Sequence, residues 1–136
     1  MSKFTLMSGS KVLLDTNIIS AWLKGEKNIA DNIEKTGAVY IPIIVLGELY
    51  YGASYSTQVQ KNTSIIRKIA SRYRLLLIDE ETTREYGKIK SELRKKGSPI
   101  PENDIWIAAI ATRYRLTLVT RDKHFSNVIG LKIEKW

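Results

Sequence analysis

The fold is decided by residues 103–122, from Asn103 to Asp122, which read NDIWIAAIATRYRLTLVTRD. Residues 105–114 of this stretch are apolar on nearly every side of a helix, which is typical of a helix buried at the centre of a protein. Asn103, directly before them, is of a type that often caps a helix N-terminus. Residues 116–120 form a short apolar run and predict a buried strand. The stretch therefore indicates an α/β fold.

Outward from this stretch, strand and helix signals alternate along the chain. Further strands are predicted at 11–15, 39–41, 75–78 and 131–134, and helices at 17–24, 27–35, 43–55, 58–73 and 80–96. Gly25 and Gly97 end two of these helices, and Pro42 suits the first turn of another. Strands separated by helices predict a three-layer sandwich in which helices flank a central parallel sheet. We expect a single domain over residues 11–136, after a loose lead-in at residues 1–10.

Acidic residues lie beside or within four of the apolar runs, where a charged side chain is costly. They are Asp15, Glu48, Asp104 and Asp122. A helix cap or a buried ion pair explains one such residue. Four of them, with no basic residue inside three of the four runs, suggest a shared cation. Hard divalent cations such as Mg²⁺ prefer oxygen ligands of this kind.

The expected fold allows these acids to meet. Asp15 and Asp122 lie at the carboxyl ends of predicted strands, and ligand sites of open α/β sheets lie beyond those ends. Asp104 opens the buried helix, where the first-turn amides favour negative charge. Glu48 lies on an otherwise apolar face of the helix predicted at 43–55. The sequence thus predicts one acidic site at this edge of the sheet.

Composition narrows the classes of function. The 136 residues carry a formal net charge of +8, which favours a polyanionic partner such as nucleic acid, although a solubilising surface is about equally compatible with composition alone. The absence of cysteine excludes disulfides, thiolate metal sites and cysteine nucleophiles, and one histidine excludes a zinc site of several imidazoles. No apolar run approaches the roughly 18 residues of a membrane span, and no secretory signal is evident, so we expect a cytoplasmic protein.

An all-oxygen cation site in a basic domain suits metal-assisted hydrolysis of phosphodiester bonds. A cation lowers the pKa of an attacking water and offsets the charge that develops on phosphate, so no protein nucleophile is needed. The sequence resembles the PIN-domain ribonucleases, and within them the VapC-type toxins of toxin–antitoxin pairs. The resembling pieces occur in family order and cover the chain from about residue 11 to its end. They are residues 14–17 (LDTN), 45–49 (VLGEL) with 51–52 (YG), 103–109 (NDIWIAA) and 118–125 (LVTRDKHF).

The resemblance implies a PIN-like sandwich, an Mg²⁺- or Mn²⁺-dependent endoribonuclease, a cognate antitoxin protein and a homodimer. It also implies that the four acids are catalytic. Asp15, Asp104 and Asp122 match direct metal ligands, and Glu48 matches a ligand or a base for the water. Each has a structural alternative: a strand-end turn for Asp15, an ion pair with an arginine for Glu48, helix capping for Asp104 and a plain loop residue for Asp122.

Weaker candidates surround the acids. Thr16 and Asn17 are expected to position Asp15 or a water, although Asn17 equally suits the cap of the next helix. Thr120 is expected to hydrogen-bond a water or phosphate, or to be a satisfied strand-end hydroxyl. Arg121 and Lys123 belong to a basic group that suits RNA phosphates or merely solvates the surface. For His124 we favour packing beside Phe125 over acid–base chemistry.

Two rival functions come from other classes. A phospho-accepting receiver domain is also a small α/β domain with acids and Mg²⁺. It requires paired acids after the first strand, whereas Asp15 is followed by Thr16. The second rival is a catalytically silent module on the same fold that binds RNA or a protein partner. The four intact acids argue against it. An assay for metal-dependent RNA cleavage separates a silent binding module from a nuclease.

Overall fold

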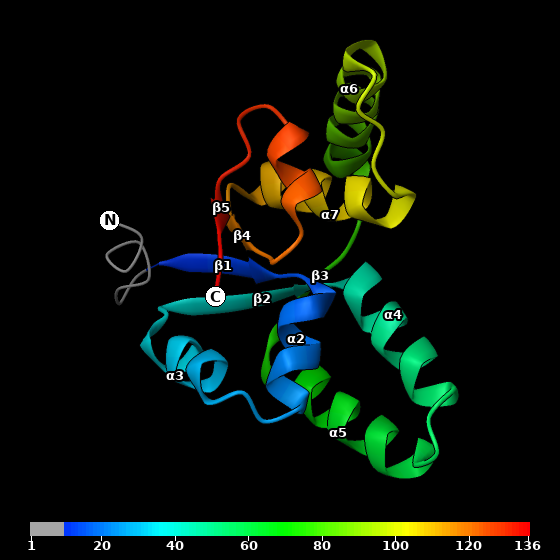
Figure 1. The fold of residues 1–136 in the computed structure, drawn as a ribbon. Helices are drawn as coiled ribbons and strands as arrows, with labels where there is room; N and C mark the ends of the chain where they lie inside the picture. The colour runs from blue at the N-terminus through cyan, green and yellow to red at the C-terminus, as the bar shows by residue number, and fades with distance from the viewer. Residues whose placement is uncertain (1–9) are drawn as a thin grey trace.

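The computed structural model describes residues 10–136 (Figure 1). Its sheet has parallel strands in the order β3-β2-β1-β4-β5. Their bounds are β1 Lys11–Leu14, β2 Ala38–Pro42, β3 Arg74–Leu76, β4 Thr117–Val119 and β5 Ile133–Glu134. The α/β sandwich with a parallel sheet that the sequence predicts is confirmed.

Helices cover both faces of the sheet (Figure 1). On one side lie α2 Thr16–Leu23, α3 Lys27–Lys35 and α5 Val59–Arg72, with α4 Ile43–Ser54 beside them. On the other side lie α6 Glu80–Lys96, α7 Glu102–Tyr114 and the 3-10 helix η1 Lys123–Asn127. A reversal of winding direction after β3 accounts for the two layers, because right-handed crossovers in opposite directions place their helices on opposite faces.

The core is centred on β1, β4 and α7. Leu13, Leu14, Leu118 and Val119 are fully buried, as expected for central strands of a parallel sheet that is covered on both faces. The middle of α7, Ile107–Ile110, is also fully buried, so the prediction of a central buried helix is confirmed. This packing fixes the ends of β1, β4 and α7 relative to one another.

Some local predictions are wrong. Asn103 does not cap α7, because the helix begins at Glu102 and Pro101 occupies the N-cap position, two residues before the predicted cap. The strand predicted at 75–78 ends at Leu76, and Leu77 is 61% exposed because β3 is an edge strand. Pro42 is the last residue of β2 and lies just before α4, not in its first turn.

The strand order separates the observed fold from the receiver domain. Doubly wound receiver-like sheets run 2-1-3-4-5, whereas this sheet runs 3-2-1-4-5. The direction of winding reverses between β1 and β4, and such a switch point opens a crevice at the carboxyl ends of the two strands. Within residues 10–136, no helix is long and apolar enough to cross a membrane.

Candidate metal centre

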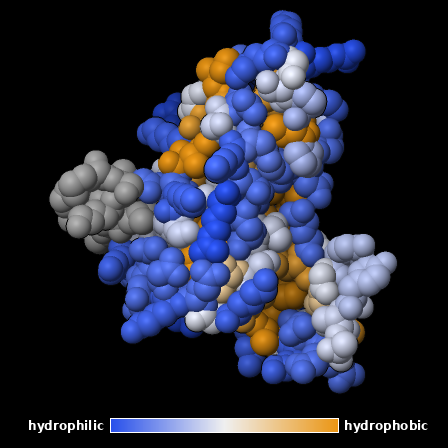
Figure 2. Space-filling model, in the orientation of Figure 1, coloured by the Kyte–Doolittle hydropathy of each residue, from blue (hydrophilic) through white to orange (hydrophobic). Residues whose placement is uncertain are grey.

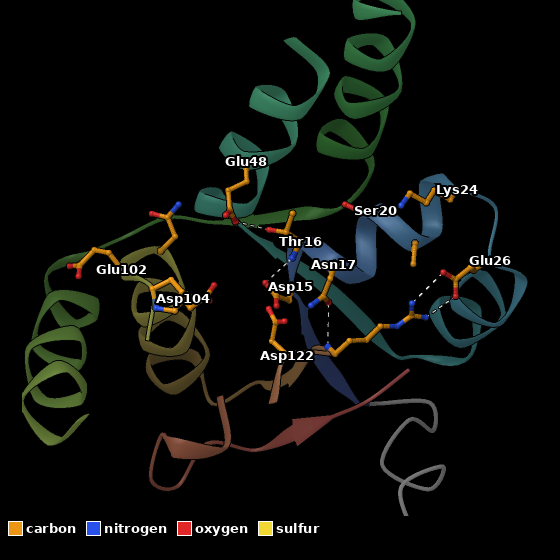
Figure 3. A pocket seen from close by; sticks show the side chains of 14 residues that line it. Asp15, Thr16, Asn17, Ser20, Lys24, Glu26, Glu48, Glu102, Asp104 and Asp122 are labelled. Atoms are coloured by element: carbon orange, nitrogen blue, oxygen red, sulfur yellow. Dashed lines mark hydrogen bonds and ion pairs between the residues drawn. The ribbon is translucent and has the colours of Figure 1, made fainter. Parts of the chain in front are cut away.

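A pocket of about 810 Å³ opens at the carboxyl ends of β1 and β4. This volume is in the range of pockets that bind small ligands. The four predicted acids, Asp15, Glu48, Asp104 and Asp122, all line it, and Figure 3 shows their side chains around it. They come from the end of β1, from α4, from the first turn of α7 and from the segment after β4. The fold thus brings together residues that lie far apart in the sequence.

Asp15 is the most deeply buried of the four, with 3% of its surface exposed. Its backbone N–H donates to the Val119 carbonyl at 3.0 Å, and its side chain caps α2 by accepting from the Thr16 N–H at 2.8 Å. The Thr120 hydroxyl donates to its other oxygen at 2.7 Å. Burial raises the pKa of Asp15 to about 6 against these hydrogen bonds, and the charges of Asp104 and Asp122 add to the rise.

Asp104 lies in the first turn of α7, and its side chain is 14% exposed. Its Oδ2 is 2.6 Å from Nε2 of His124. Burial raises the pKa of Asp104 above its usual range; contact with His124 opposes that rise, while Asp122 and Glu48 add to it. The first-turn position agrees with a capping role as well, but the Asp104 side chain makes no hydrogen bond to the α7 backbone.

Glu48 reaches the pocket from α4. The Thr16 hydroxyl donates to its Oε1 at 2.6 Å. An arginine partner was the structural alternative for Glu48, and no ion pair of Glu48 is found within residues 10–136. Thr16 therefore positions Glu48 with its hydroxyl and Asp15 with its backbone N–H.

Asp122 differs from the other three because it is exposed. It lies three residues beyond β4, in the N-cap position of η1, and the expectation that apolar neighbours enclose it is wrong. Its backbone N–H donates to the Thr120 hydroxyl at 3.0 Å. One ligand atom each from Asp104, Asp122 and His124 lie within 4.8 Å of one another. Asp15 and Glu48 line the same pocket outside this group of three.

The donor set fits a hard divalent cation. In the described part of the chain, no lysine or arginine pairs with any of the four acids, and the only cationic partner is His124 if it is protonated. Carboxylates gathered without countercharge repel one another, and this repulsion adds to burial, the larger cause, in raising the pKa values of Asp15 and Asp104. A cation among these oxygens removes that repulsion, and carboxylates are the ligands that Mg²⁺ and similar ions prefer.

The supporting residues tie the two strand ends together. Thr120, only 2% exposed, links Asp15 to Asp122 by donating to one and accepting from the other. Asn17 does not cap α2, since Asp15 does; its Oδ1 accepts from the Arg121 N–H at 3.3 Å instead. Thr120 is thus a satisfied hydroxyl and at the same time a direct contact of the acidic pocket.

Some of the basic residues are less free to bind phosphate than the sequence suggests, because they already form ion pairs. Arg121 lines the pocket, but its guanidinium pairs with Glu26 at 2.8 Å and donates to the Trp136 carbonyl at 3.0 Å. Lys123 is exposed at the start of η1. Arg113, in the last turn of α7, is not available either, because it pairs with Asp79 and Glu81.

His124 is the residue that sequence reasoning underestimated. It does lie against Phe125, with ring centroids 4.8 Å apart, as expected. It also contacts Asp104, which the sequence analysis did not anticipate. Its position two residues after Asp122 was the available signal, because a short turn there keeps both side chains near the strand end.

Comparisons with known proteins agree with this fold. The family model described as PIN domain matches residues 12–131. Ribonuclease VapC2 of Haemophilus influenzae is 36% identical over 93% of this chain and 98% of that protein. The tRNA(fMet)-specific endonuclease VapC of Salmonella typhimurium is 32% identical over the same shares of the two chains. The crystal structure of VapBC2 from Rickettsia felis, bound to a DNA fragment from their promoter, contains a similar chain with a TM-score of 0.86 and 34% identity, covering 93% of this chain and 98% of that one.

Proposed function

Because the chain belongs to the PIN-domain family and its relatives are VapC ribonucleases, we propose that it is a metal-dependent endoribonuclease that acts as the toxin of a toxin–antitoxin pair. The observation that carries the proposal is the pocket itself. Asp15 is a buried carboxylate with two hydrogen-bond donors and no cationic partner among the described residues, and Glu48, Asp104 and Asp122 line the same pocket without a lysine or arginine partner there.

Each acid has a proposed part in holding the cation, which is Mg²⁺ or Mn²⁺. When bound among these acids, such a cation would supply activation of a water and charge to offset that developing on the scissile phosphate. Asp15, Asp104 and Asp122 provide ligand oxygens, and Glu48 acts as a further ligand or as the base that takes a proton from the water. Thr16 and Thr120 keep Glu48 and Asp15 in place through hydrogen bonds of 2.6 and 2.7 Å.

The substrate is RNA, whose phosphates suit a basic protein of net charge +8. Lys24 and Arg121 line the pocket and Lys123 lies exposed beside it, so we assign them to phosphate binding. Arg121 must leave Glu26 and the Trp136 carbonyl to do so. Loss of the ion pair is inexpensive, because Glu26 is exposed and the pair is screened by solvent.

A second hollow, next to the acidic pocket, suits a protein partner. Figure 2 shows hydrophobic surface in the hollow between α2 and the α4–α5 pair, which Leu23, Leu49, Ala53 and Ile66 line. Tyr51 and Tyr55 of α4 are 66% and 78% exposed nearby. We assign this surface to the antitoxin or to a homodimer in the cytoplasm. An antitoxin Arg or Lys that enters the adjoining acidic pocket replaces the charge of the cation and silences the site.

The proposal is tested with purified protein and end-labelled RNA. We expect cleavage in Mg²⁺ or Mn²⁺, none in EDTA, and products with a 5′-phosphate and a 3′-hydroxyl, because the attacking group is water. Asp104→Asn should abolish cleavage while keeping RNA binding, since the amide retains the size of the side chain and loses its charge. Cleavage in EDTA, or 2′,3′-cyclic phosphate ends, would falsify the mechanism. Binding without any cleavage by the wild type identifies a silent binding module instead.

The domain limits and the toxin role have their own tests. A protein starting at Ser10 should fold and cleave like the full chain if residues 11–136 form the whole nuclease domain. Expression of the wild type should stop growth, and co-expression of the cognate antitoxin should restore it. Normal growth with well-expressed, cleavage-competent protein contradicts the toxin role.

A further inference from the structure

His124 is the only histidine of the chain, and it lies at the acidic pocket. Its Nε2 is 2.6 Å from Oδ2 of Asp104, and its ring shares with Asp104 and Asp122 a group of ligand atoms within 4.8 Å of one another. In an octahedral site with bonds of about 2.1 Å, neighbouring ligand atoms are about 3 Å apart and opposite ones about 4.2 Å. The three side chains therefore need only small adjustments to share one cation.

The fold holds His124 in this position. It belongs to η1, and the next residue, Phe125, is fully buried and anchors the short helix in the core. The two rings touch, with their centroids 4.8 Å apart, which restricts rotation of the imidazole. Within residues 10–136, Asp104 is the only side chain with which the imidazole forms a hydrogen bond, and Nδ1 has no hydrogen-bond partner there.

We propose that His124 is a nitrogen ligand of the cation that Asp104 and Asp122 hold, and that it makes the site prefer transition-metal ions such as Mn²⁺ over Mg²⁺. The inference rests on the proposed function, because it concerns the same cation. A bound cation would displace the proton shared by Nε2 and Oδ2, which would pass to Nδ1 as the imidazole changes tautomer or to solvent, and both atoms would become ligands.

The preference follows from ligand chemistry. Mg²⁺ favours oxygen ligands and retains several waters, so it gains little from an imidazole. Transition ions bind nitrogen more strongly, and their affinity for a mixed site rises from Mn²⁺ through Co²⁺ to Ni²⁺. A site with one imidazole and carboxylates should therefore discriminate among these ions, whereas an all-carboxylate site discriminates less.

The alternative is that His124 only orients Asp104 by donating a hydrogen bond to it. A positioning residue of that kind changes the affinity for every cation by a similar factor, because it acts through the carboxylate. A ligand changes the affinity for Co²⁺ and Mn²⁺ much more than the affinity for Mg²⁺. The ratio of affinities thus distinguishes the two roles.

The experiment measures Mg²⁺, Mn²⁺ and Co²⁺ binding by calorimetry on tag-free full-length protein. The variants are His124→Ala, His124→Gln, which keeps an N–H donor beside Asp104, and Ser126→Ala as a control on the same short helix. We expect both His124 variants to lose at least about tenfold in Co²⁺ affinity with little change for Mg²⁺, and Ser126→Ala to match the wild type. An equal loss for all three ions, or no loss, overturns the inference.

A second measurement does not depend on affinity. Mn²⁺ bound to the wild type should show ¹⁴N imidazole couplings by pulsed electron paramagnetic resonance, and these should be absent in His124→Gln. Since the chain has one histidine, such a signal has a single source. Bound Mn²⁺ without imidazole coupling in the wild type overturns the inference.

The outcomes also separate this inference from the proposed function. If Asp104→Asn abolishes cation binding and cleavage while the His124 variants keep the wild-type ion preference, the nuclease proposal stands and only the ligand role of His124 falls. If the wild type binds no cation, both fall.

Discussion

Asp15 and Asp79 each follow a strand of the sheet, and each caps the helix that comes next, α2 and α6. Each accepts a backbone N–H at 2.8 Å and a threonine hydroxyl at 2.7 Å. They differ in their charged neighbours. Arg113 donates to Asp79 at 2.9 Å, whereas Asp15 faces the carboxylates of Asp104 and Asp122.

The pKa values record this difference. Hydrogen bonds from Arg113 and Thr82 hold the pKa of Asp79 well below its usual range, whereas burial raises that of Asp15 to about 6. One helix supplies both environments, because α7 brings Asp104 in its first turn to Asp15 and Arg113 in its last turn to Asp79. The same local capping structure therefore stabilises the fold at Asp79, whereas at Asp15 it leaves a carboxylate without a positive partner. The charges that differ come from residues distant in the sequence.

The largest expected effect of this difference is on cleavage. Asp15→Asn removes a ligand charge from the pocket and should lower the RNA cleavage rate by at least about 100-fold. Asp79→Asn should cleave like the wild type at a temperature where it remains folded, because Asp79 lies outside the pocket. Single-turnover cleavage of labelled RNA measures both. Comparable losses of cleavage rate in the two variants would contradict the conclusion that Asp15 belongs to the site and Asp79 does not.

Cation binding gives the next largest effect. An ion that binds only the folded protein adds about 2.7 kcal/mol to its stability at 100 times the dissociation constant. Mg²⁺ or Mn²⁺ should thus raise the melting temperature of the wild type and of Asp79→Asn by similar amounts, and that of Asp15→Asn much less. Thermal scans with and without EDTA provide the measurement. An undiminished shift in Asp15→Asn would show that the ion binds elsewhere.

Without cations, the two aspartates should affect stability with opposite signs. The folded-state pKa of Asp15 lies above its unfolded value, so the folded protein binds that proton more tightly and stability falls as pH rises from about 3.8 to about 6. In EDTA at pH 7.5, Asp15→Asn should therefore be more stable than the wild type by about 1 to 2 kcal/mol, less than the full pKa shift because the amide satisfies the two donors less well.

Asp79→Asn should instead melt at a lower temperature. The pKa of Asp79 is lowered on folding, so its contribution is present above the unfolded pKa and is lost as pH falls through the folded one. Urea unfolding in EDTA over a pH series measures both variants. A destabilised Asp15→Asn at pH 7.5 would mean that its carboxylate has a compensating partner.

The sequence predicted the architecture because its strongest signals are local. The buried helix at 105–114 and the apolar runs of β1 and β4 have patterns that few other structures accommodate. Leu77 was misassigned because an edge strand and a central strand can have the same apolar run, and only the sheet order separates them. Asn103 was misassigned because Pro101 lets the helix begin earlier, without a side-chain cap.

The candidate site was only partly predictable for a different reason. The apolar runs singled out all four acids, and the resemblance supplied their roles. For Asp122 the apolar run misled, because the chain turns outward after β4 and leaves that side chain exposed. The contacts of Thr16 with Glu48 and of His124 with Asp104 span 32 and 20 residues. Such pairs depend on how α4 packs against α2 and η1 against α7, which no single sequence displays.

The smallest expected effect compares the two threonines that serve these aspartates. Thr82 and Thr120 are both buried, each donates to its aspartate at 2.7 Å, and each also accepts a backbone N–H. Replacing either by Val keeps the shape and removes the hydroxyl, so both variants should lose about 1 kcal/mol of unfolding free energy in EDTA. Only Thr120→Val should also weaken Mg²⁺ binding, by about tenfold, since it frees a proposed ligand to move. Urea unfolding and Mg²⁺ titration of the two variants measure this. If Thr82→Val weakened Mg²⁺ binding equally, Mg²⁺ affinity would depend on the stability of the whole fold. The difference between Asp15 and Asp79 would then not arise from their immediate surroundings.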